Sequence, residues 1–357
     1  MLDFLVIGGG IAGVSAAARL AEAGTVLLLE SEAALAYHAS GRSAALFEEN
    51  YGKPSTVALN AASRAYHEAA GVLSPRGFML VGTPGEAEAF ETDRATMGLD
   101  VVTMAEALEL LPILDTSRVD RAAWHADAWD IDTDALVQGF VRSAKARGAE
   151  VRTRAPVTAI RDTGQGWEVV AGGQTHTARQ IVNASGAWAD PVAAMAGIAP
   201  IGITPYRRSM ARIPAPGGHD VAGWPMIFGP GESWYAKPDA GALLVSPAEE
   251  DEVAPQDAWA EDMVLAEGLA RWEAHVTAPV TRLIASWAGL RSFAPDRTLV
   301  LGPDPLNPRF LWCAGQGGYG MQSSPAASRL LADLVAGRAP EIDGTHVAAL
   351  SPARLRR

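Results

Sequence analysis

The first thirty residues follow a regular order of apolar and small residues. Residues 2–7 form an apolar run that stops at three glycines, and residues 11–23 are alanine-rich with helical spacing. Residues 25–30 form a second apolar run that ends on a carboxylate. This order predicts a strand, a glycine turn, a helix and a second strand, which together make one βαβ unit.

The same periodicities predict elements along the rest of the chain. Helices are expected over 55–70, 84–111, 132–147 (capped by Asp132 or Thr133), 258–275 and 322–336. Strands are expected over 72–82, 151–160, 166–171, 179–184, 286–293, 298–301 and 310–314, and short strands dominate 195–290. The mixture of helices and strands predicts an α/β (α+β) protein.

Composition and charge narrow the class of protein. The chain has 357 residues, 48% hydrophobic, and a formal net charge of −12. The acidic balance argues against nucleic acid as a partner. A single cysteine, Cys313, excludes an internal disulfide and any multi-cysteine metal site, and no metal is expected. Because no long apolar span and no basic segment before residues 2–7 is found, the default expectation is a cytoplasmic protein without a transmembrane segment.

Residues 8–13, GGGIAG, fit the pattern G-x-G-x-x-G between a predicted strand and a predicted helix. In this pattern Gly8 permits the tight turn, Gly10 lets the backbone approach a pyrophosphate, and Gly13 lets the helix pack on the strand. The helix N-terminus offers free amides to the phosphates. Glu30, at the end of the second strand, can accept the hydroxyls of an adenosine ribose, so FAD or NAD is favoured over NADP.

A second glycine turn, residues 315–320, precedes the last predicted helix. A nicotinamide enzyme has no need of a second such turn, whereas a helix N-terminus can stabilise the charge of a reduced flavin. FAD is therefore preferred. Because the two turns lie at opposite ends of the chain, we expect a Rossmann-like FAD-binding domain assembled from 1–75, 132–192 and 286–345. A mixed-sheet substrate domain, 76–131 and 193–285, is inserted into it, and 346–357 form a C-terminal tail.

Six ordered motifs carry a family resemblance. GGGIAG with Glu30, HASGRSAA, VNASGAWAD, SWYAKPDAG, SWAGLRSFAPD and GQGGYGMQSS resemble the D-amino-acid-oxidase (DAO) superfamily of flavoproteins, and within it bacterial D-arginine and D-amino acid dehydrogenases. The resemblance extends from residue 1 to about 335. It implies an FAD domain and a substrate domain whose large mixed sheet covers the flavin.

The motifs and the resemblance together name the residues expected at the cofactor. These are Gly8, Gly10, Ile11, Ala12, Gly13, Glu30, Ser31, His38, Ser40, Gly41, Arg42, Ser43, Ala44, Val157, Ala184, Gly186, Gly315, Gly317, Gly318, Tyr319, Gly320, Met321 and Gln322. FAD is expected to be bound non-covalently, because Cys313 lies inside an apolar strand.

The resemblance also implies catalytic roles. Arg208 and Arg291 match arginines that clamp a substrate carboxylate, which suits the bidentate guanidinium fork. Tyr51 and Tyr235 match tyrosines that line the pocket and bond the carboxylate. Gly318 matches a glycine whose carbonyl faces the substrate amine. These five residues are the expected catalytic set.

Two positions depart from the arginine dehydrogenase pattern. Leu46 stands where that relative has a histidine, and Phe78 stands where it has a glutamate facing the substrate side chain. A phenyl ring offers a cation only a weak cation–π contact. A neutral, apolar or aromatic substrate side chain is therefore expected, provided that Phe78 faces the pocket and not the core.

The resulting hypothesis is an FAD-dependent D-amino acid dehydrogenase or oxidase. Hydride transfer from Cα to flavin N5 would give an imino acid, which hydrolyses to a 2-keto acid and ammonia. The D configuration comes from the resemblance alone. A glycine- or sarcosine-type secondary-amine oxidase is the alternative, and a non-catalytic flavoprotein subunit is a weaker one. The electron acceptor (oxygen, a quinone or a protein) and the oligomeric state stay open.

Overall fold

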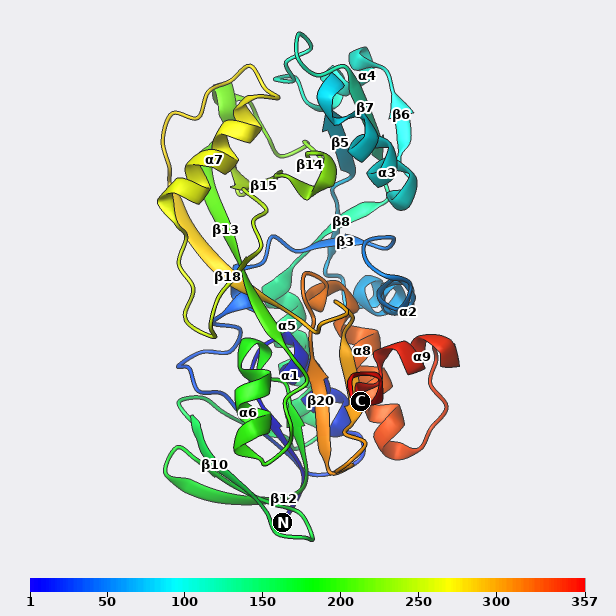
Figure 1. Cartoon of the computed structure of the whole chain (residues 1–357), viewed down its shortest axis with the longest axis vertical. Helices are drawn as coiled ribbons and strands as arrows, with labels where there is room; N and C mark the ends of the chain where they lie inside the picture. The colour runs from blue at the N-terminus through cyan, green and yellow to red at the C-terminus, as the bar shows by residue number, and fades with distance from the viewer. Residues whose placement is uncertain (357) are drawn as a thin grey trace.

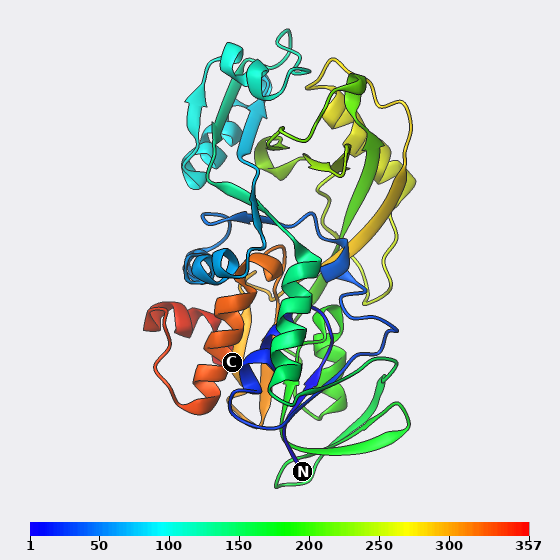
Figure 2. The ribbon, with the colours of Figure 1, turned by 180° about the vertical axis from the view of Figure 1, so that it is seen from behind.

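The computed structural model describes residues 1–356 as an elongated molecule with two halves, one above the other in Figure 1. An eight-stranded sheet with its helices makes up the lower half, and a nine-stranded sheet makes up the upper half. The rear view shows α5 beside the strands of the lower half (Figure 2). The N- and C-terminal ends of the chain both lie in the lower half.

The eight-stranded sheet contains the predicted βαβ unit at its centre. Its main path is β10 (Val157–Asp162), β11 (Trp167–Ala171), β12 (Gln174–Asn183), β1 (Leu2–Ile7), β2 (Val26–Leu29) and β9 (Glu150–Arg152), with β20 (Phe310–Ala314) beside β12 and β19 (Val300–Pro303) beside β20. The pairs among β20, β12, β1, β2 and β9 are parallel. Strands from the beginning, middle and end of the chain thus share one sheet.

Both faces of this sheet are covered, as a parallel sheet requires. Along β1, Phe4 and Val6 pack with α1 (Ile11–Leu20), α5 (Thr133–Ala146) and α8 (Gly320–Ala336). Leu5 and Ile7 point to the other face, towards α6 (Ala189–Met195). The near-continuous apolar sequence of β1 follows from this burial on both sides.

The nine-stranded sheet is mixed. Its order is β17 (Asp251–Glu252), β13 (Thr204–Pro214), β16 (Ala242–Ser246), β15 (Tyr235–Asp239), β14 (Met226–Phe228), β5 (Phe78–Gly82), β7 (Arg121–His125) and β6 (Asp100–Val102), with β18 (Ala285–Phe293) paired to β13. Only β14 and β5 run parallel. The long β13–β18 ladder runs from the upper half down towards the lower one (Figure 1).

Alternation along β5 decides which side chains face the site. Met79 and Val81 join a cluster with residues of α4 (Met104–Leu110) and with Trp272 of α7 (Asp262–Glu273). Phe78 and Leu80 join a different cluster, which includes α3 (Ala87–Met97), Phe228 and Tyr235. A third sheet, β3 (Leu46–Glu48), β8 (Ala128–Ile131) and β4 (Leu73–Pro75), lies next to α2 (Pro54–Ala69) and between the two halves (Figure 1).

The fold confirms the α/β class and the order of most elements, with differences at specific places. The strand expected over 72–82 is two strands, β4 and β5, because Gly77 turns the chain at φ 73°. The helix expected over 84–111 is interrupted by β6, after Gly98 ends α3 in the left-handed conformation. β18 pairs with β13 in the upper sheet, although its residues were grouped with the FAD-binding segments.

Residues 344–356, which were expected to belong mostly to a C-terminal tail, are packed onto the lower half. Helix α9 spans Gly344–Leu350 and is followed by a 3₁₀ turn, Pro352–Leu355. Arg354 pairs with Asp296 at 2.7 Å, and Arg356 pairs with the buried Asp304 at 2.5 Å. The basic end of the chain therefore neutralises two carboxylates of the fold.

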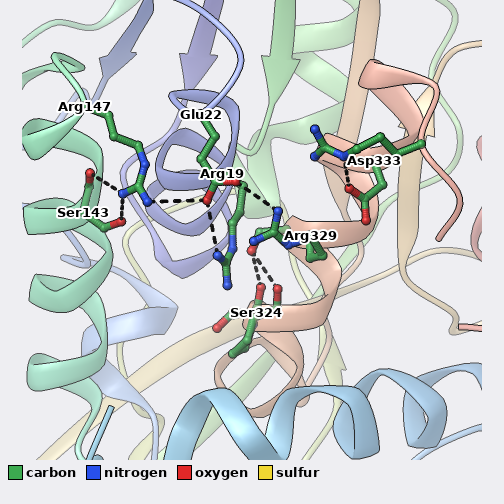
Figure 3. A network of polar contacts seen from close by, with 10 residues as sticks. Arg19, Glu22, Ser143, Arg147, Ser324, Arg329 and Asp333 are labelled. Atoms are coloured by element: carbon green, nitrogen blue, oxygen red, sulfur yellow. Dashed lines mark hydrogen bonds and ion pairs between the residues drawn. The ribbon is translucent and has the colours of Figure 1, made fainter. Parts of the chain in front are cut away.

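A cluster of charges joins three helices of the lower half (Figure 3). Glu22, just beyond α1, lies 3.4 Å from Arg19 of α1, 3.0 Å from Arg329 of α8 and 3.9 Å from Arg147 at the end of α5. Partial burial opposes ionisation of Glu22, but the hydrogen bonds and charges of Arg329 and Arg19 hold its pKa below the usual value. One carboxylate thus offsets the repulsion of three guanidinium groups.

Replacing Glu22 with glutamine should lower stability at neutral pH by about 1 kcal/mol, because the cluster is partly solvated and screened. The folded-state pKa of Glu22 is lowered, so its contribution is present above the unfolded-state pKa and is lost as pH falls through the folded-state value. Urea unfolding at pH 7 and at pH 3.5 should show the wild type and Glu22→Gln converging at the lower pH. Glu267→Gln, an exposed carboxylate of α7, is the control; an equal loss there would contradict the role of the cluster.

Candidate active site

Three adjoining cavities run from the first glycine turn to the upper sheet. The first, the nucleotide cavity, has a volume of about 410 Å³. Among the predicted residues it is lined by Gly8, Gly10, Glu30, Ser31, His38, Ser40, Arg42, Val157, Ala184 and Gly186. The central cavity, about 150 Å³, adds Ile11, Ala12, Ser43, Ala44, Gly317, Gly318, Gly320, Met321, Arg208, Tyr235 and Arg291. The distal cavity, about 90 Å³, adds Leu46, Tyr51, Phe78 and Gln322.

The glycine turn after β1 is shaped by close backbone approaches. A Cβ atom on Gly13 would lie 1.8 Å from the carbonyl oxygen of Gly8, and one on Gly8 would lie 2.4 Å from the carbonyl oxygen of Ala184. Gly8 also has φ 108°, which favours glycine. The turn therefore has to be made of glycine, and its bare backbone faces the nucleotide cavity together with the start of α1. This arrangement fits a pyrophosphate.

Glu30 closes the other side of the same turn. Its carboxylate accepts hydrogen bonds from the amide of Gly9 at 2.7 Å, the amide of Glu32 at 2.8 Å and the hydroxyl of Ser31 at 3.0 Å. Glu30 thus ties the end of β2 to the glycine turn that follows β1, and it also lines the cavity. A carboxylate has further acceptor sites, which leaves capacity for a ribose hydroxyl.

The loop after β2 covers the nucleotide cavity. Ser40 Oγ accepts the amide of Ile11 at 3.0 Å, and Arg42 donates to the carbonyl oxygens of Ala258 and Ala288, both at 2.9 Å, and pairs with Asp257 at 2.6 Å. These contacts join the loop to β18 and to the chain that follows β17. A segment far away in the sequence therefore forms part of the cavity wall.

Arg208 and Arg291 both line the central cavity, one from β13 and the other from β18. Arg208 is 6% exposed and donates from Nη2 to Glu250 at 3.1 Å. Its Nε and Nη1 atoms are buried without a hydrogen-bond partner among residues 1–356. Buried N–H groups of this kind require an acceptor. The free edge of Arg208 therefore fits a carboxylate or a polar ring edge in the central cavity.

Arg291 lines both the central and the distal cavity. Burial disfavours its charged form, but Tyr51, Tyr235 and Glu232 raise its pKa above the ordinary value, so it is a permanent cation. A Cβ atom on Gly318 would lie 3.1 Å from the guanidinium carbon, so the guanidinium packs closely against the backbone of the second glycine turn. Burial and Glu232 raise the pKa of Tyr51, whose hydroxyl stays protonated and lies 3.2 Å from Glu232.

The distal cavity is mostly apolar. Phe78 is 5% exposed, stacks on Phe228 with centroids 4.4 Å apart, and lines the cavity together with Leu46 and Met226. The sequence left open whether Phe78 faces the pocket, and alternation along β5 places it there. Its role in specificity stays a proposal.

Sequence reasoning missed two carboxylates in the distal cavity. Glu48 is 2% exposed, accepts the amide of Asn50 at 3.1 Å and lies 3.0 Å from His125 Nε2. Glu232 lies in a turn at φ 51° and accepts the hydroxyl of Tyr51. Neither belongs to a recognisable motif; the one signal for Glu48 was its position two residues after Leu46 on the same strand face.

A buried lysine was also missed. Lys237 of β15 pairs with Asp130 at 2.8 Å and donates to the carbonyl oxygens of Ala44 and, at 3.1 Å, Ala45. Ala45 has φ 30°, a conformation that a side chain rarely adopts. Lys237 therefore fixes the loop that lines the central and distal cavities.

Four residues expected at the cofactor line none of the three cavities: Gly13, Gly41, Gly315 and Tyr319. Gly13 acts through packing of α1. A Cβ on Gly41 would lie 2.3 Å from the carbonyl oxygen of Ala36, so Gly41 serves the turn. Gly315 has φ 72°, and the ring of Tyr319 lies 5.0 Å from that of Tyr51.

The acidic run 249–252 is not fully solvated, because Glu249 accepts the amide of Ser209 at 2.7 Å.

The remaining predictions concern groups outside the cavities. Cys313 is buried, and burial raises the pKa of its thiol to about 12, so it stays protonated and unreactive at neutral pH. Among residues 1–356, no His, Cys, Asp and Glu side chains gather as metal ligands. In the same part of the chain, no helix has both the length and the apolar character needed to cross a membrane.

Replacing Glu30 with alanine should weaken FAD binding, since it removes a charged acceptor and loosens the glycine turn. The loss of a hydrogen bond to a charged group costs about 1.5–3 kcal/mol, or roughly 10- to 150-fold in the dissociation constant. Titration of apoprotein with FAD, followed by flavin fluorescence, measures this. Glu267→Ala, an exposed carboxylate of α7 outside the cavities, is the control; unchanged FAD affinity in Glu30→Ala would contradict the assigned role.

Comparison with known proteins agrees with this geometry. The chain is 25% identical to human mitochondrial dimethylglycine dehydrogenase over 96% of its length, but it spans only 43% of that relative. It is 25% identical to glycine oxidase of Bacillus licheniformis, covering 94% of this chain and 93% of the relative. A D-amino acid dehydrogenase of Xanthobacter autotrophicus is 44% identical over 57 residues, 16% of this chain and 13% of that one.

The fold and the family follow from two further findings. The solved structure of glycine oxidase from Geobacillus kaustophilus superposes with a TM-score of 0.84 at 23% identity, covering 99% of this chain and 98% of that one. Residues 3–334 match the family described as DAO, FAD dependent oxidoreductase. The chain therefore belongs to the DAO family of FAD-dependent oxidoreductases.

Proposed function

We propose that this protein oxidises the Cα–N bond of a D-amino acid with a neutral, apolar side chain. The observation that carries the proposal is the position of Arg291, a permanent cation on the wall shared by the central and distal cavities. A substrate whose carboxylate pairs with Arg291 would lie at the junction, with its side chain in the distal cavity. Its Cα would face the central cavity, where the FAD ring, held non-covalently, is expected.

The chain's own residues bind and orient the substrate in this proposal. Arg291 and the free edge of Arg208 hold the carboxylate, and the hydroxyls of Tyr51 and Tyr235 bond to it. The carbonyl of Gly318 accepts from the substrate amine, which must lose a proton to solvent before reaction. Orientation of this kind supplies much of the rate.

In the overall reaction the substrate loses a hydride from Cα and a proton from nitrogen. When bound, FAD supplies the acceptor for the hydride that leaves Cα. The nitrogen gives up a proton, and the imino acid that results is hydrolysed to a 2-keto acid and ammonia. The two electrons then pass to an acceptor that is oxygen, a quinone or another protein.

The distal cavity supports an apolar side chain. Leu46, Phe78 and Phe228 form its wall. Glu48 and Glu232 each accept one hydrogen bond from the protein there, and Glu48 Oε2 has no hydrogen-bond partner within residues 1–356. The proposal of an apolar substrate side chain therefore rests on the aromatic and aliphatic wall. The D configuration rests on the sequence resemblance and on the short match to D-amino acid dehydrogenase.

A secondary-amine oxidase of the glycine or sarcosine type is the second candidate. It is favoured by the match to a glycine oxidase along nearly the whole length of both chains, whereas the D-amino acid dehydrogenase match is short. Both candidates use the same carboxylate site and differ in what fills the distal cavity. The buried set of Arg208, Arg291, Tyr51 and Tyr235 argues against a subunit without catalysis of its own.

An anaerobic flavin-reduction screen separates these candidates. The substrates are both enantiomers of leucine, phenylalanine, methionine, arginine and lysine, together with glycine, sarcosine and dimethylglycine. Bleaching of the flavin by D-leucine, D-methionine or D-phenylalanine supports the proposal, and bleaching by glycine, sarcosine or dimethylglycine alone would replace it with the alternative.

Arg291→Ala should lower kcat/KM on every substrate by roughly 30-fold or more, since a buried charge pair costs about 2–5 kcal/mol. Arg282→Ala, an exposed arginine before β18, should leave the rates unchanged.

Placing a carboxylate at position 78 should change the preference. Phe78→Glu should raise kcat/KM for D-arginine and D-lysine relative to D-leucine and D-phenylalanine, because a buried carboxylate attracts a cation and is costly beside an apolar group. Phe78→Leu keeps the wall apolar and is the matched control. If the ratio does not move in folded, FAD-loaded Phe78→Glu, Phe78 has no part in specificity.

A further inference from the structure

Helix α8 begins at the central cavity and contains a proline in its second turn. Pro325 has no amide hydrogen, so the carbonyl of Met321 lacks its usual helical donor. The hydroxyl of Ser324 donates to that carbonyl at 3.1 Å instead. The first turn of α8, residues 320–325, is therefore held to the rest of the helix more weakly than an uninterrupted turn would be.

Two residues of α2 bind this turn from behind. Ser63 Oγ accepts the amide of Ala326 at 3.1 Å, and His67 Nε2 lies 2.8 Å from the carbonyl oxygen of Gln322. In a regular α-helix this amide and this carbonyl pair with each other, four residues apart. Here each of them also bonds to α2, at the point where the proline interrupts the ladder.

The contact from His67 has a defined hydrogen-bond direction. A carbonyl oxygen can only accept, so Nε2 carries the proton and His67 is the donor. His67 is fully buried, and burial lowers its pKa, so the ring is neutral at physiological pH. Its Nδ1 atom is buried with no hydrogen-bond partner among residues 1–356. Burying an imidazole whose second nitrogen has no hydrogen-bond partner lowers the stability of the fold, so the position of His67 calls for an explanation.

The bound turn presents its other side to the cavities. Met321 lines the central and distal cavities, and Gln322 lines the distal one. Gln322 Oε1 accepts the amide of Glu48 at 3.0 Å, while its Nε2 is buried without a partner within residues 1–356. The backbone of this turn is thus anchored to α2, while Gly320, Met321 and Gln322 of the same turn line the cavities and Gln322 keeps a free side-chain donor.

We infer that Ser63 and His67 are positioning residues that fix the N-terminus of α8 against the FAD ring. A helix N-terminus carries partial positive charge that falls off within one turn, so its effect on a ring depends on how closely the turn is held. Through the carbonyl of Gln322, His67 sets that distance and, with it, the ease with which bound FAD accepts electrons. The inference rests on FAD binding and is independent of which amine is oxidised.

The midpoint potential of bound FAD tests this directly in the holoenzyme. His67→Phe keeps the ring but removes the donor. It should shift the potential to a more negative value, changing the ratio of reduced to oxidised FAD at a fixed potential by about threefold. His67→Gln, whose amide can still donate to the carbonyl, should bring the midpoint potential most of the way back to the wild-type value. Glu68→Gln, the exposed neighbour in α2, should leave the potential at the wild-type value.

A merely structural role would give a different pattern. In that case His67→Phe would lower the melting temperature without moving the potential or the visible spectrum of the flavin, and this result would overturn the inference. If His67→Phe does not fold, Ser63→Ala removes the other anchor at lower cost. A potential shift in the same direction supports the inference, and an unchanged potential in Ser63→Ala overturns it.

Discussion

Close backbone approach at the two glycine turns is the constraint on which the site depends. Gly13 leaves only 1.8 Å between a virtual Cβ and the carbonyl of Gly8, so α1 can start directly against the end of β1. A side chain at Gly13 would push α1 away from the strand end and so displace the turn that lines the nucleotide cavity. At the other turn, Gly318 leaves room for the guanidinium of Arg291.

The charges of the site come from the upper sheet, whereas the cofactor cradle comes from the lower one. β13 and β18 pair from Thr204 to Arg212 of β13 and carry Arg208 and Arg291 to the central cavity. Two nitrogen atoms of Arg208 are buried without hydrogen-bond partners within residues 1–356, and the carboxylate of Glu232 favours the charged form of Arg291. The protein therefore maintains buried positive charge that an anionic ligand group can satisfy. This is the physical basis for expecting a carboxylate.

The distal cavity, where the proposed function places the substrate side chain, combines an apolar wall with two carboxylates. Phe78 and Phe228 stack to form the wall. Glu48 accepts the amide of Asn50 and lies 3.0 Å from His125, and Glu232 accepts the hydroxyl of Tyr51. The carboxylates contribute to the shape of the cavity and to the positions of Tyr51 and His125. The same arrangement separates this chain from the arginine dehydrogenase pattern, in which an acid stands at the Phe78 position.

The sequence by itself determined the βαβ unit, the second glycine turn and the family, because these depend on local rules: glycine where no Cβ fits, apolar runs for buried strands, and motif order. Most of the site residues that it named also line the three cavities. Only the tertiary structure decided that β18 pairs with β13 in the upper sheet, that Phe78 faces the cavity, and that Glu48, Glu232 and Lys237 reach the site. The reason is that strand register and long-range side-chain contacts join segments that are far apart in the sequence, such as Lys237 and Ala44, and no local pattern encodes such pairs.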